Sequence, residues 1–151
     1  MIPVQNVKYV VPLYPTSATN GQAITSNIVD LIGYDYASLA LSGSTSNNAT
    51  NSPSAVGLTF SDSTSGPFVA DASLTGGLSA GNFAIPNSPT ATSNQPYIVF
   101  NFDTRSRPRY CKLGVTPVTT QTYFAQAVLS RAAVVPISAA DMNVSGAVVN
   151  A

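Results

Sequence analysis

The chain contains no histidine, and its six acidic residues are all aspartate, so glutamate is absent as well. Histidine is the commonest general base of enzymes and a frequent metal ligand. Its absence excludes a Ser-His-Asp triad, a Cys-His pair and any zinc or iron site held by histidine. A glycosidase-type carboxylate pair would need two aspartates brought close together, and nothing in their spacing indicates this. We therefore predict a protein that is not an enzyme and that holds no metal or cofactor.

Charged residues are scarce, at 8% of the 151 positions, against about 25% in ordinary soluble proteins. Serine, threonine and asparagine together supply 46 residues, so hydroxyl and amide groups must cover much of the surface. The hydrophobic fraction of 44% is high enough for a packed core. Because a net charge of zero removes the self-repulsion that keeps proteins apart, we expect this molecule to associate with other macromolecules.

A disulfide and a membrane-spanning segment are also missing from the sequence. The single cysteine, Cys111, cannot form an internal bridge, which agrees with a reducing compartment. No run of about 18 apolar residues exists, so no transmembrane helix is predicted. Residues 1–15 lack the basic and long apolar regions of a signal peptide. We expect the chain to be made and to fold in a cytosol, without contact with a membrane.

What the sequence does contain is the pattern of an all-β protein. Eleven prolines and ten glycines interrupt it at short intervals, and helical periodicity is nearly absent. Alternation of apolar and polar residues predicts three half-buried strands, at residues 55–62, 96–103 and 109–118. Residues 122–136 are rich in alanine, which also suits a helix, but Tyr123, Phe124 and Val128 favour a strand. The side chains expected to face the core are Val56, Leu58, Phe60, Ile98, Phe100, Phe102, Cys111, Leu113 and Val115.

The first third of the chain predicts further strands, at residues 7–13 and within 24–43, the latter interrupted at Gly33. Turn-rich connections are predicted between these strands, at residues 14–21, 42–54 and 74–96. Seven or eight short strands with this spacing predict a single-domain β-sandwich that resembles a jelly roll and spans residues 1–151. We expect the two ends, residues 1–20 and about 133–151, to extend from it as arms.

Four of the six positive charges lie in the segment DTRSRPRYCKLGV, as Arg105, Arg107, Arg109 and Lys112. The three arginines share one parity, so an extended backbone would present their guanidinium groups on one side, where they could bind carboxylates or phosphates. Four cations in a neutral chain are a weak indication of nucleic-acid binding, and none is predicted. Two interpretations stay open: contact with a partner protein, and internal pairing with Asp103 and another aspartate.

Other candidate sites favour structural interpretations. Asp30 and Asp35 flank Gly33, where a calcium site is conceivable, but aspartates that accept hydrogen bonds from turn amides are commoner. Cys111 is next to Lys112, yet neighbours on a strand point to opposite faces, so a buried and unreactive thiol is favoured. The glycines of residues 75–82 lack the lysine of a phosphate-binding loop. A hydrolase that uses a serine activated by lysine, or a pair of aspartates, ranks last.

Two stretches together resemble a set of virion proteins of tailed bacteriophages. They are ITSNIVDLIGYDYASLALSG, residues 24–43, and RPRYCKLGVTPVTTQTYFAQAVLSRAAVVP, residues 107–136. The matching positions, which look like fold-bearing ones, are Asp30, Gly33, Tyr34, Asp35, Tyr36, Arg109, Tyr110, Lys112 and Leu113. The chain departs from the set around Ser61 and Asp62, where long polar loops follow the strand. The resemblance implies a β-sandwich head-decoration protein, also called a cement or minor capsid protein, on the outside of the capsid.

Under this resemblance the chain would bind the major capsid protein and stabilise contacts between its subunits, as a homo-oligomer for which a trimer is favoured. The contacts with the capsid would come from the N-terminal segment and the cationic segment, with the residues Val4, Val7, Tyr9, Val11, Arg105, Arg107, Arg109 and Lys112. The alternative from another class is a receptor- or glycan-binding module of a tail or fibre. That module would use Tyr34, Tyr36 and Tyr97 at an exposed groove, together with the polar loops 42–54 and 74–96.

Overall fold

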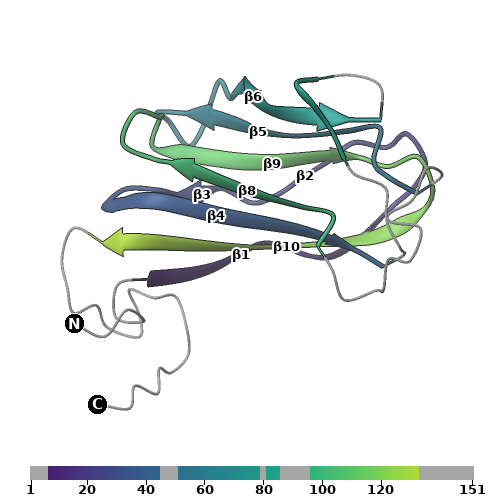
Figure 1. Cartoon of the computed structure of the whole chain (residues 1–151), viewed down its shortest axis with the longest axis horizontal. Coiled ribbons are helices and arrows are strands. Elements are labelled where there is room, and N and C mark those ends of the chain that lie inside the picture. The colour runs from purple at the N-terminus through teal and green to yellow at the C-terminus, as the bar shows by residue number, and fades with distance from the viewer. Residues whose placement is uncertain (1–6, 45–50, 79–80, 86–95, 133–151) are drawn as a thin grey trace, which may run out of the picture.

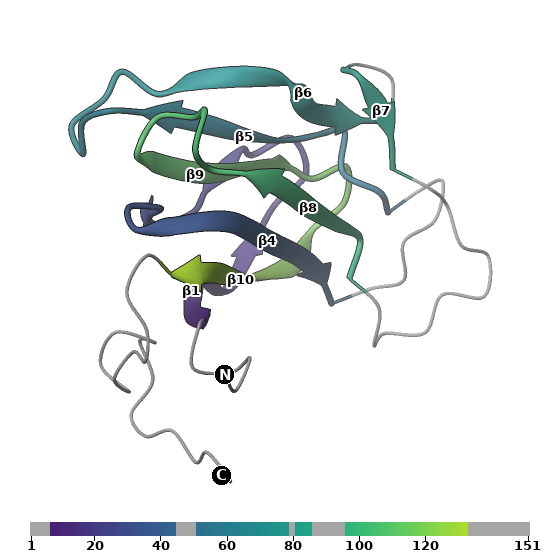
Figure 2. The ribbon, with the colours of Figure 1, turned by 60° about the vertical axis from the view of Figure 1, so that its left-hand side comes forward.

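The computed structural model describes residues 7–44, 51–78, 81–85 and 96–132, and these residues form strands and no helix. The strands build two sheets that stack face to face (Figure 1, Figure 2). Sheet A has four strands in the order β1 (Val7–Ala18), β10 (Gln121–Ala132), β4 (Tyr34–Gly43) and β8 (Ile98–Asp103). Sheet B has six strands, in the order β2 (Ile24–Thr25), β9 (Tyr110–Thr116), β5 (Ala55–Ser61), β6 (Val69–Gly77) and β7 (Phe83–Ala84), with β3 (Val29–Asp30) also paired to β9. The predicted all-β, sandwich-like architecture is thus confirmed.

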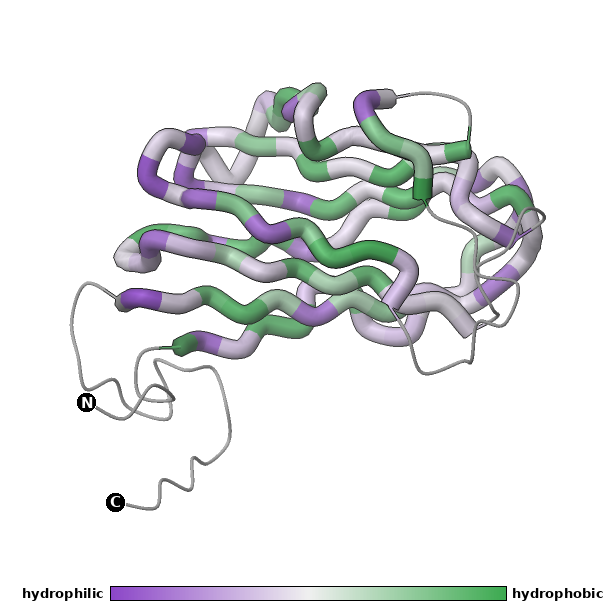
Figure 3. Tube along the Cα trace, in the orientation of Figure 1, coloured by the Kyte–Doolittle hydropathy of each residue, from purple (hydrophilic) through white to green (hydrophobic). Residues whose placement is uncertain are grey.

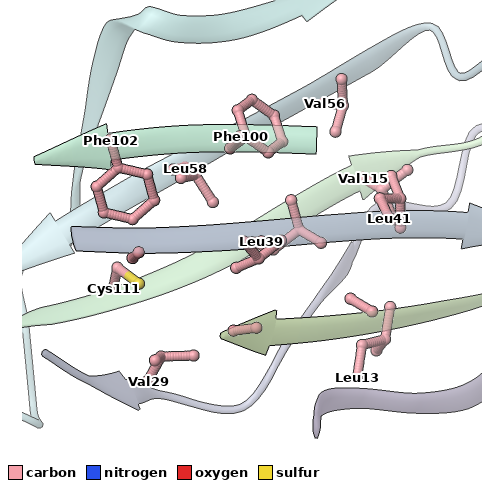
Figure 4. Close-up of a cluster of buried hydrophobic side chains, with 14 of the residues drawn as sticks. Leu13, Val29, Leu39, Leu41, Val56, Leu58, Phe100, Phe102, Cys111 and Val115 are labelled. Carbon is pink, nitrogen blue, oxygen red and sulfur yellow. The ribbon is translucent and has the colours of Figure 1, made fainter. Parts of the chain in front are cut away.

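The core lies between the two sheets and follows from the alternation in the sequence. Along β5 and β9 the residues predicted to face inward are all buried, whereas the residues between them are more exposed. Figure 3 shows the same alternation as a change of hydropathy from residue to residue along the strands. Figure 4 shows Leu39 and Leu41 of β4 meeting Leu58 of β5 and Val115 of β9, so both sheets contribute to one core.

The alanine-rich segment that suited either a helix or a strand forms strand β10 over Gln121–Ala132. This strand lies between β1 and β4 in sheet A. Its alanines lie opposite large residues of the neighbouring strand β4: Ala127 is opposite Leu39, and Ala125 is opposite Leu41. All four side chains are buried. Small residues on one strand therefore leave space for leucines on the next, which explains why the segment is rich in alanine without being helical.

Strand β1 is longer than predicted, because it continues to Ala18 through a segment that we expected to be a turn. Its pairing with β10 shifts register on both sides of Leu13, and the prolines at positions 12 and 15 fall at these irregularities. Proline has no N–H to donate to a neighbouring strand, so it is tolerated at bulges and on edge strands such as β1. Residues 7–18 thus belong to the sandwich and not to an arm, while residues 1–6 and 133–151 lie outside the described residues.

Strand β6 was not predicted, and its glycines are fixed by close contacts. A Cβ atom added to Gly77 would collide with the Ser54 carbonyl, and one added to Gly76 would collide with the ring of Phe83.

Gly33 was predicted to interrupt the segment 24–43, and it does so in the turn between β3 and β4. Its φ of +82° lies in the left-handed region that favours glycine.

A buried polar network closes the core next to β4. The hydroxyl of Tyr97 donates to Oε1 of Gln121 at 2.7 Å, and Nε2 of Gln121 lies 2.7 Å from the Tyr123 hydroxyl and 2.9 Å from the Asn51 carbonyl. The Tyr97 ring also packs over Gly43, where an added Cβ would approach Cζ of the ring to 2.5 Å. Because its polar groups are bonded to one another, this network can be buried at little cost.

Candidate functional site

The three clustered arginines lie in the connection between β8 and β9, residues 104–109, which crosses one end of the sandwich from sheet A to sheet B (Figure 2). The backbone here is turned and not extended: the N–H of Arg107 donates to the Thr104 carbonyl at 3.2 Å, which closes a tight turn. Thr104 is buried, and its amide donates to the Asp35 carbonyl at 2.9 Å. The expectation that one extended strand presents all three guanidinium groups on one side is therefore wrong.

Arg105 pairs with the carboxylate of Asp103 on the outer surface at the end of β8. Its Nε lies 3.0 Å from Oδ1 of Asp103, and its backbone N–H donates to the same oxygen at 2.9 Å. These hydrogen bonds, first those from the side chain, lower the pKa of Asp103 to about 2. The guanidinium carbon of Arg105 is 5.5 Å from the ring centre of Tyr36. The guanidinium carbon of Arg131 lies 5.2 Å from the same ring centre.

Arg107 covers the end of the core between the two sheets. Its guanidinium carbon lies 5.3 Å from the ring centre of Phe60 in sheet B and 5.6 Å from that of Phe102 in sheet A. The guanidinium forms an ion pair with Asp71, and Nε donates to the Asp103 carbonyl at 3.1 Å. Only 24% of the Arg107 side chain is exposed, so this ion pair is partly shielded from water. The pKa of Asp71 is lowered, mainly by the hydrogen bond from the Ser73 hydroxyl and also by Arg107.

Arg109 connects β9 to β3 through Asp30. Its Nε and Nη2 donate to the two oxygens of the Asp30 carboxylate at 2.9 and 2.7 Å, a two-point contact that lowers the pKa of Asp30. Asp30 also accepts the amide of Ile32 at 3.1 Å, which is the turn role that we favoured over a calcium site. The nearby Asp35 forms an ion pair with Arg131 at 3.7 Å.

The structure thus confirms the interpretation in which the clustered arginines pair with Asp103 and other aspartates. Sequence reasoning missed Asp71, which lies 36 positions before Arg107, and no local pattern could have identified it. Contact of these arginines with a partner protein stays a prediction. Lys112 is separate from the three, since it lies on β9 with its amino group 4.2 Å from the ring centre of Phe68.

Cys111 points into the core, away from Lys112, as predicted. Burial raises the pKa of its thiol to about 12, because the charged thiolate would be desolvated there. The thiol is therefore almost entirely protonated at neutral pH, and this form is a poor nucleophile. The side chain acts as a small apolar group of the core.

The predicted contact residues of the N-terminal segment lie on β1, except Val4, which is outside the described residues. Tyr9 is opposite Val128 of β10, and Val128 is opposite Ser38 of β4. This row belongs to the side of sheet A that faces away from sheet B, called here the outer face. The residues of this face include Val7, Tyr9, Ser38, Ala40, Val99, Asn101, Phe124, Gln126 and Val128.

The aromatic groove of the alternative module does not form with the residues proposed for it. Tyr97 is 6% exposed and is bonded inside the core, so a ligand cannot reach it. Tyr36 is partly buried beneath the guanidinium groups of Arg105 and Arg131. Residues 45–50, 79–80 and 86–95, which make up much of the two polar loops, lie outside the described residues.

Within the described part of the chain, no group of three or more histidine, cysteine or acidic side chains is placed to hold a metal ion. The same residues contain no helix that is long and apolar enough to cross a membrane. No model of a known protein family matches the chain, and no curated protein matches it significantly.

Proposed function

We propose that this chain is a structural protein of a tailed-phage virion, located on the capsid exterior, that binds the major capsid protein and stabilises contacts between its subunits. The observation that carries the proposal is the outer face of sheet A. Cross-strand neighbours on this face form rows, of which one contains Tyr9, Val128, Ser38 and Asn101 and another contains Phe124 and Ser42. Between and including these two rows, the described residues of the face carry no charge. Tyr9 and Val99 are 36% and 41% exposed there. An uncharged sheet face with exposed apolar groups suits contact with another protein.

The charged side chains support the same proposal, because most of those in the described residues are paired within the chain. Asp30, Asp35, Asp71 and Asp103 each form an ion pair with an arginine of the chain. A body that acts by being held between capsid subunits needs rigidity and an adhesive surface, and it needs no reactive group.

The two stretches that carry the resemblance to phage virion proteins pair with each other. Residues 24–43 contain β3 and β4, and residues 107–136 contain β9 and β10. Strand β3 pairs with β9 in sheet B, and β4 pairs with β10 in sheet A. The Asp30–Arg109 ion pair joins a matching position of one stretch to a matching position of the other. The two stretches therefore belong to one structural unit.

The test is binding of the recombinant protein to capsids from which it is missing. We expect it to sediment with these capsids and to raise their thermal midpoint. The double variant Tyr9→Ser/Val99→Ser should lose this binding while keeping the circular dichroism spectrum of the wild type. A matched control is Ile32→Ser, since Ile32 is 59% exposed in the turn after β3, away from the outer face.

The proposal fails if the wild type does not bind such capsids and their heat resistance is the same with and without it. Gold labelling of whole virions separates the proposal from the receptor-binding alternative. Label distributed over the head supports decoration, whereas label at one vertex or on the tail supports adhesion. Light scattering of the purified protein tests the proposed trimer.

A further inference from the structure

A cleft of about 510 Å³ lies beside the arginine connection, between the turn after β5 and residues 106–108. These two turns occupy the same end of the sandwich (Figure 1, Figure 2). The volume is within the range of small-ligand sites in proteins. The cleft is lined by Phe60, Ser61, Asp62, Ser63, Gly66, Pro67, Val69, Ala70, Asp71, Ser106, Arg107 and Pro108.

Several polar groups of the lining are already bonded within the chain. The Ser61 hydroxyl oxygen accepts the amide of Ser63 at 3.1 Å, and the Ser63 hydroxyl is 2.9 Å from that of Ser65. Asp71 accepts hydrogen bonds from Ser73 and Arg107. These groups have little capacity left for the many hydroxyls of a saccharide.

Asp62 differs from the other carboxylates of the described residues, because it is the one without an ion pair. It is exposed and accepts one long hydrogen bond, 3.4 Å, from the amide of Arg109. The cleft therefore contains two carboxylates, of Asp62 and Asp71, and one guanidinium, of Arg107, and its net charge is negative at neutral pH.

Apart from Ser106, the rest of the lining is apolar, and it presents no ring face for stacking. Pro67, Val69 and Pro108 form the walls, and Val69 is 66% exposed. Phe60 is only 4% exposed, with the Arg107 guanidinium over its ring, so a sugar cannot stack on it. Apolar walls beside an unpaired carboxylate suit an occupant that has an apolar stem and a cationic end.

We propose that this cleft binds a lysine or arginine side chain projecting from a partner protein, with Asp62 as the carboxylate that receives the cation. The apolar stem of the incoming residue lies against Pro67 and Val69. This assignment is independent of the virion role, because it rests on the cleft and its charges alone. It also places the contact at an end of the sandwich distinct from the outer face of sheet A.

The test is an NMR titration of the ¹⁵N-labelled protein with Nα-acetyl-lysine methylamide and Nα-acetyl-arginine methylamide. Nα-acetyl-norleucine methylamide serves as the control, since it has an apolar stem and no charge. We expect shifts at the amides of residues 61–63, 68–71, 106 and 107 for the two cationic probes, with dissociation constants on the order of 1–10 mM. Asp62→Asn should weaken their binding about two- to fivefold, the range of an exposed ion pair. Asp35→Asn, the same charge change outside the cleft lining, should leave it unaltered.

Three results would overturn the assignment. The first is the absence of shifts at these residues with either cationic probe. The second is equal binding of the norleucine derivative, or binding that Asp62→Asn leaves unaltered. The third is tighter binding of methyl α-mannoside at the same residues, which would assign the cleft to saccharides instead.

Discussion

Replacing Arg107 with methionine removes the guanidinium that bridges the two sheets and keeps an unbranched apolar stem in its place. The variant loses the ion pair with Asp71 and the contacts of the cation with the rings of Phe60 and Phe102. About a quarter of the arginine side chain and a fifth of the aspartate side chain are exposed. The pair therefore lies between an exposed ion pair, worth about 0.2–1 kcal/mol, and a buried one, whose disruption costs about 3–5 kcal/mol.

Each cation–ring contact adds about 0.5–1 kcal/mol at a site that water still reaches. Solvent screening reduces the ion-pair contribution, and the methionine stem recovers part of the packing. We therefore expect Arg107→Met to lower the free energy of unfolding by about 2–3 kcal/mol. Arg105→Met is the matched control: its side chain is 58% exposed, so water screens its ion pair with Asp103 and its loss should cost clearly less stability than the loss of Arg107.

The assay is urea unfolding at pH 7, followed by circular dichroism and by the fluorescence of the seven tyrosines, since the chain has no tryptophan. Asp71→Asn should destabilise in the same direction, and the double variant should cost less than the sum of the single ones, because the two residues share one interaction. If the free energy of unfolding of Arg107→Met lies within about 0.5 kcal/mol of that of the wild type, the guanidinium does not close the core. If that variant keeps its stability and also fails to bind capsids, Arg107 acts as a contact residue for the partner and not as a structural one.

Three further predictions concern the surface carboxylates, the single cysteine and the buried polar network. The folded-state pKa values of Asp30 and Asp103 lie below the unfolded value of about 3.9, so both carboxylates contribute stability above that pH. This contribution is lost as the pH falls below the unfolded value, and for Asp103 the loss continues to a pKa of about 2. With no histidine or glutamate in the chain, urea midpoints should stay nearly constant between about pH 5 and 8 and fall below about pH 4; a midpoint that changes steeply near pH 6.5 would contradict this. A thiol reagent at pH 8 should label Cys111 completely in denaturant and hardly at all in native buffer, and equal rates would show that it is not buried. Gln121→Leu removes two buried hydrogen bonds, with the Tyr97 and Tyr123 hydroxyls, and should cost about 3 kcal/mol in urea unfolding. Gln126→Leu, on the exposed face of the same strand, should be nearly neutral.

The strands that the sequence predicts well are those with one buried and one exposed face. Strands β5 and β9 lie at the centre of sheet B, where alternate residues pack against sheet A, so burial imposes a period of two on the sequence. Strand β6 is further from the centre, and only its last two residues, Gly76 and Gly77, are buried. Because burial does not select its other side chains, no alternation marks it. The sequence predicts too short a strand β1, because its prolines indicate a turn, whereas a bulged edge strand accommodates them.

Which aspartate neutralises which arginine depends on how the sheets stack, and local sequence contains only part of that information. Asp103 is two positions from Arg105, so this pair was predictable, but Asp30 is 79 positions from Arg109. A cluster that looks like a positive patch in the sequence is therefore largely neutralised once the chain is folded. Long-range steering of an acidic partner by this cluster is correspondingly weak, because the field of an ion pair falls off faster than that of a lone cation. The surfaces left to attract a partner are the uncharged part of the outer face of sheet A, which excludes the row that ends at Asp103, and the carboxylate of Asp62. Both can be altered without removing a residue of the four ion pairs.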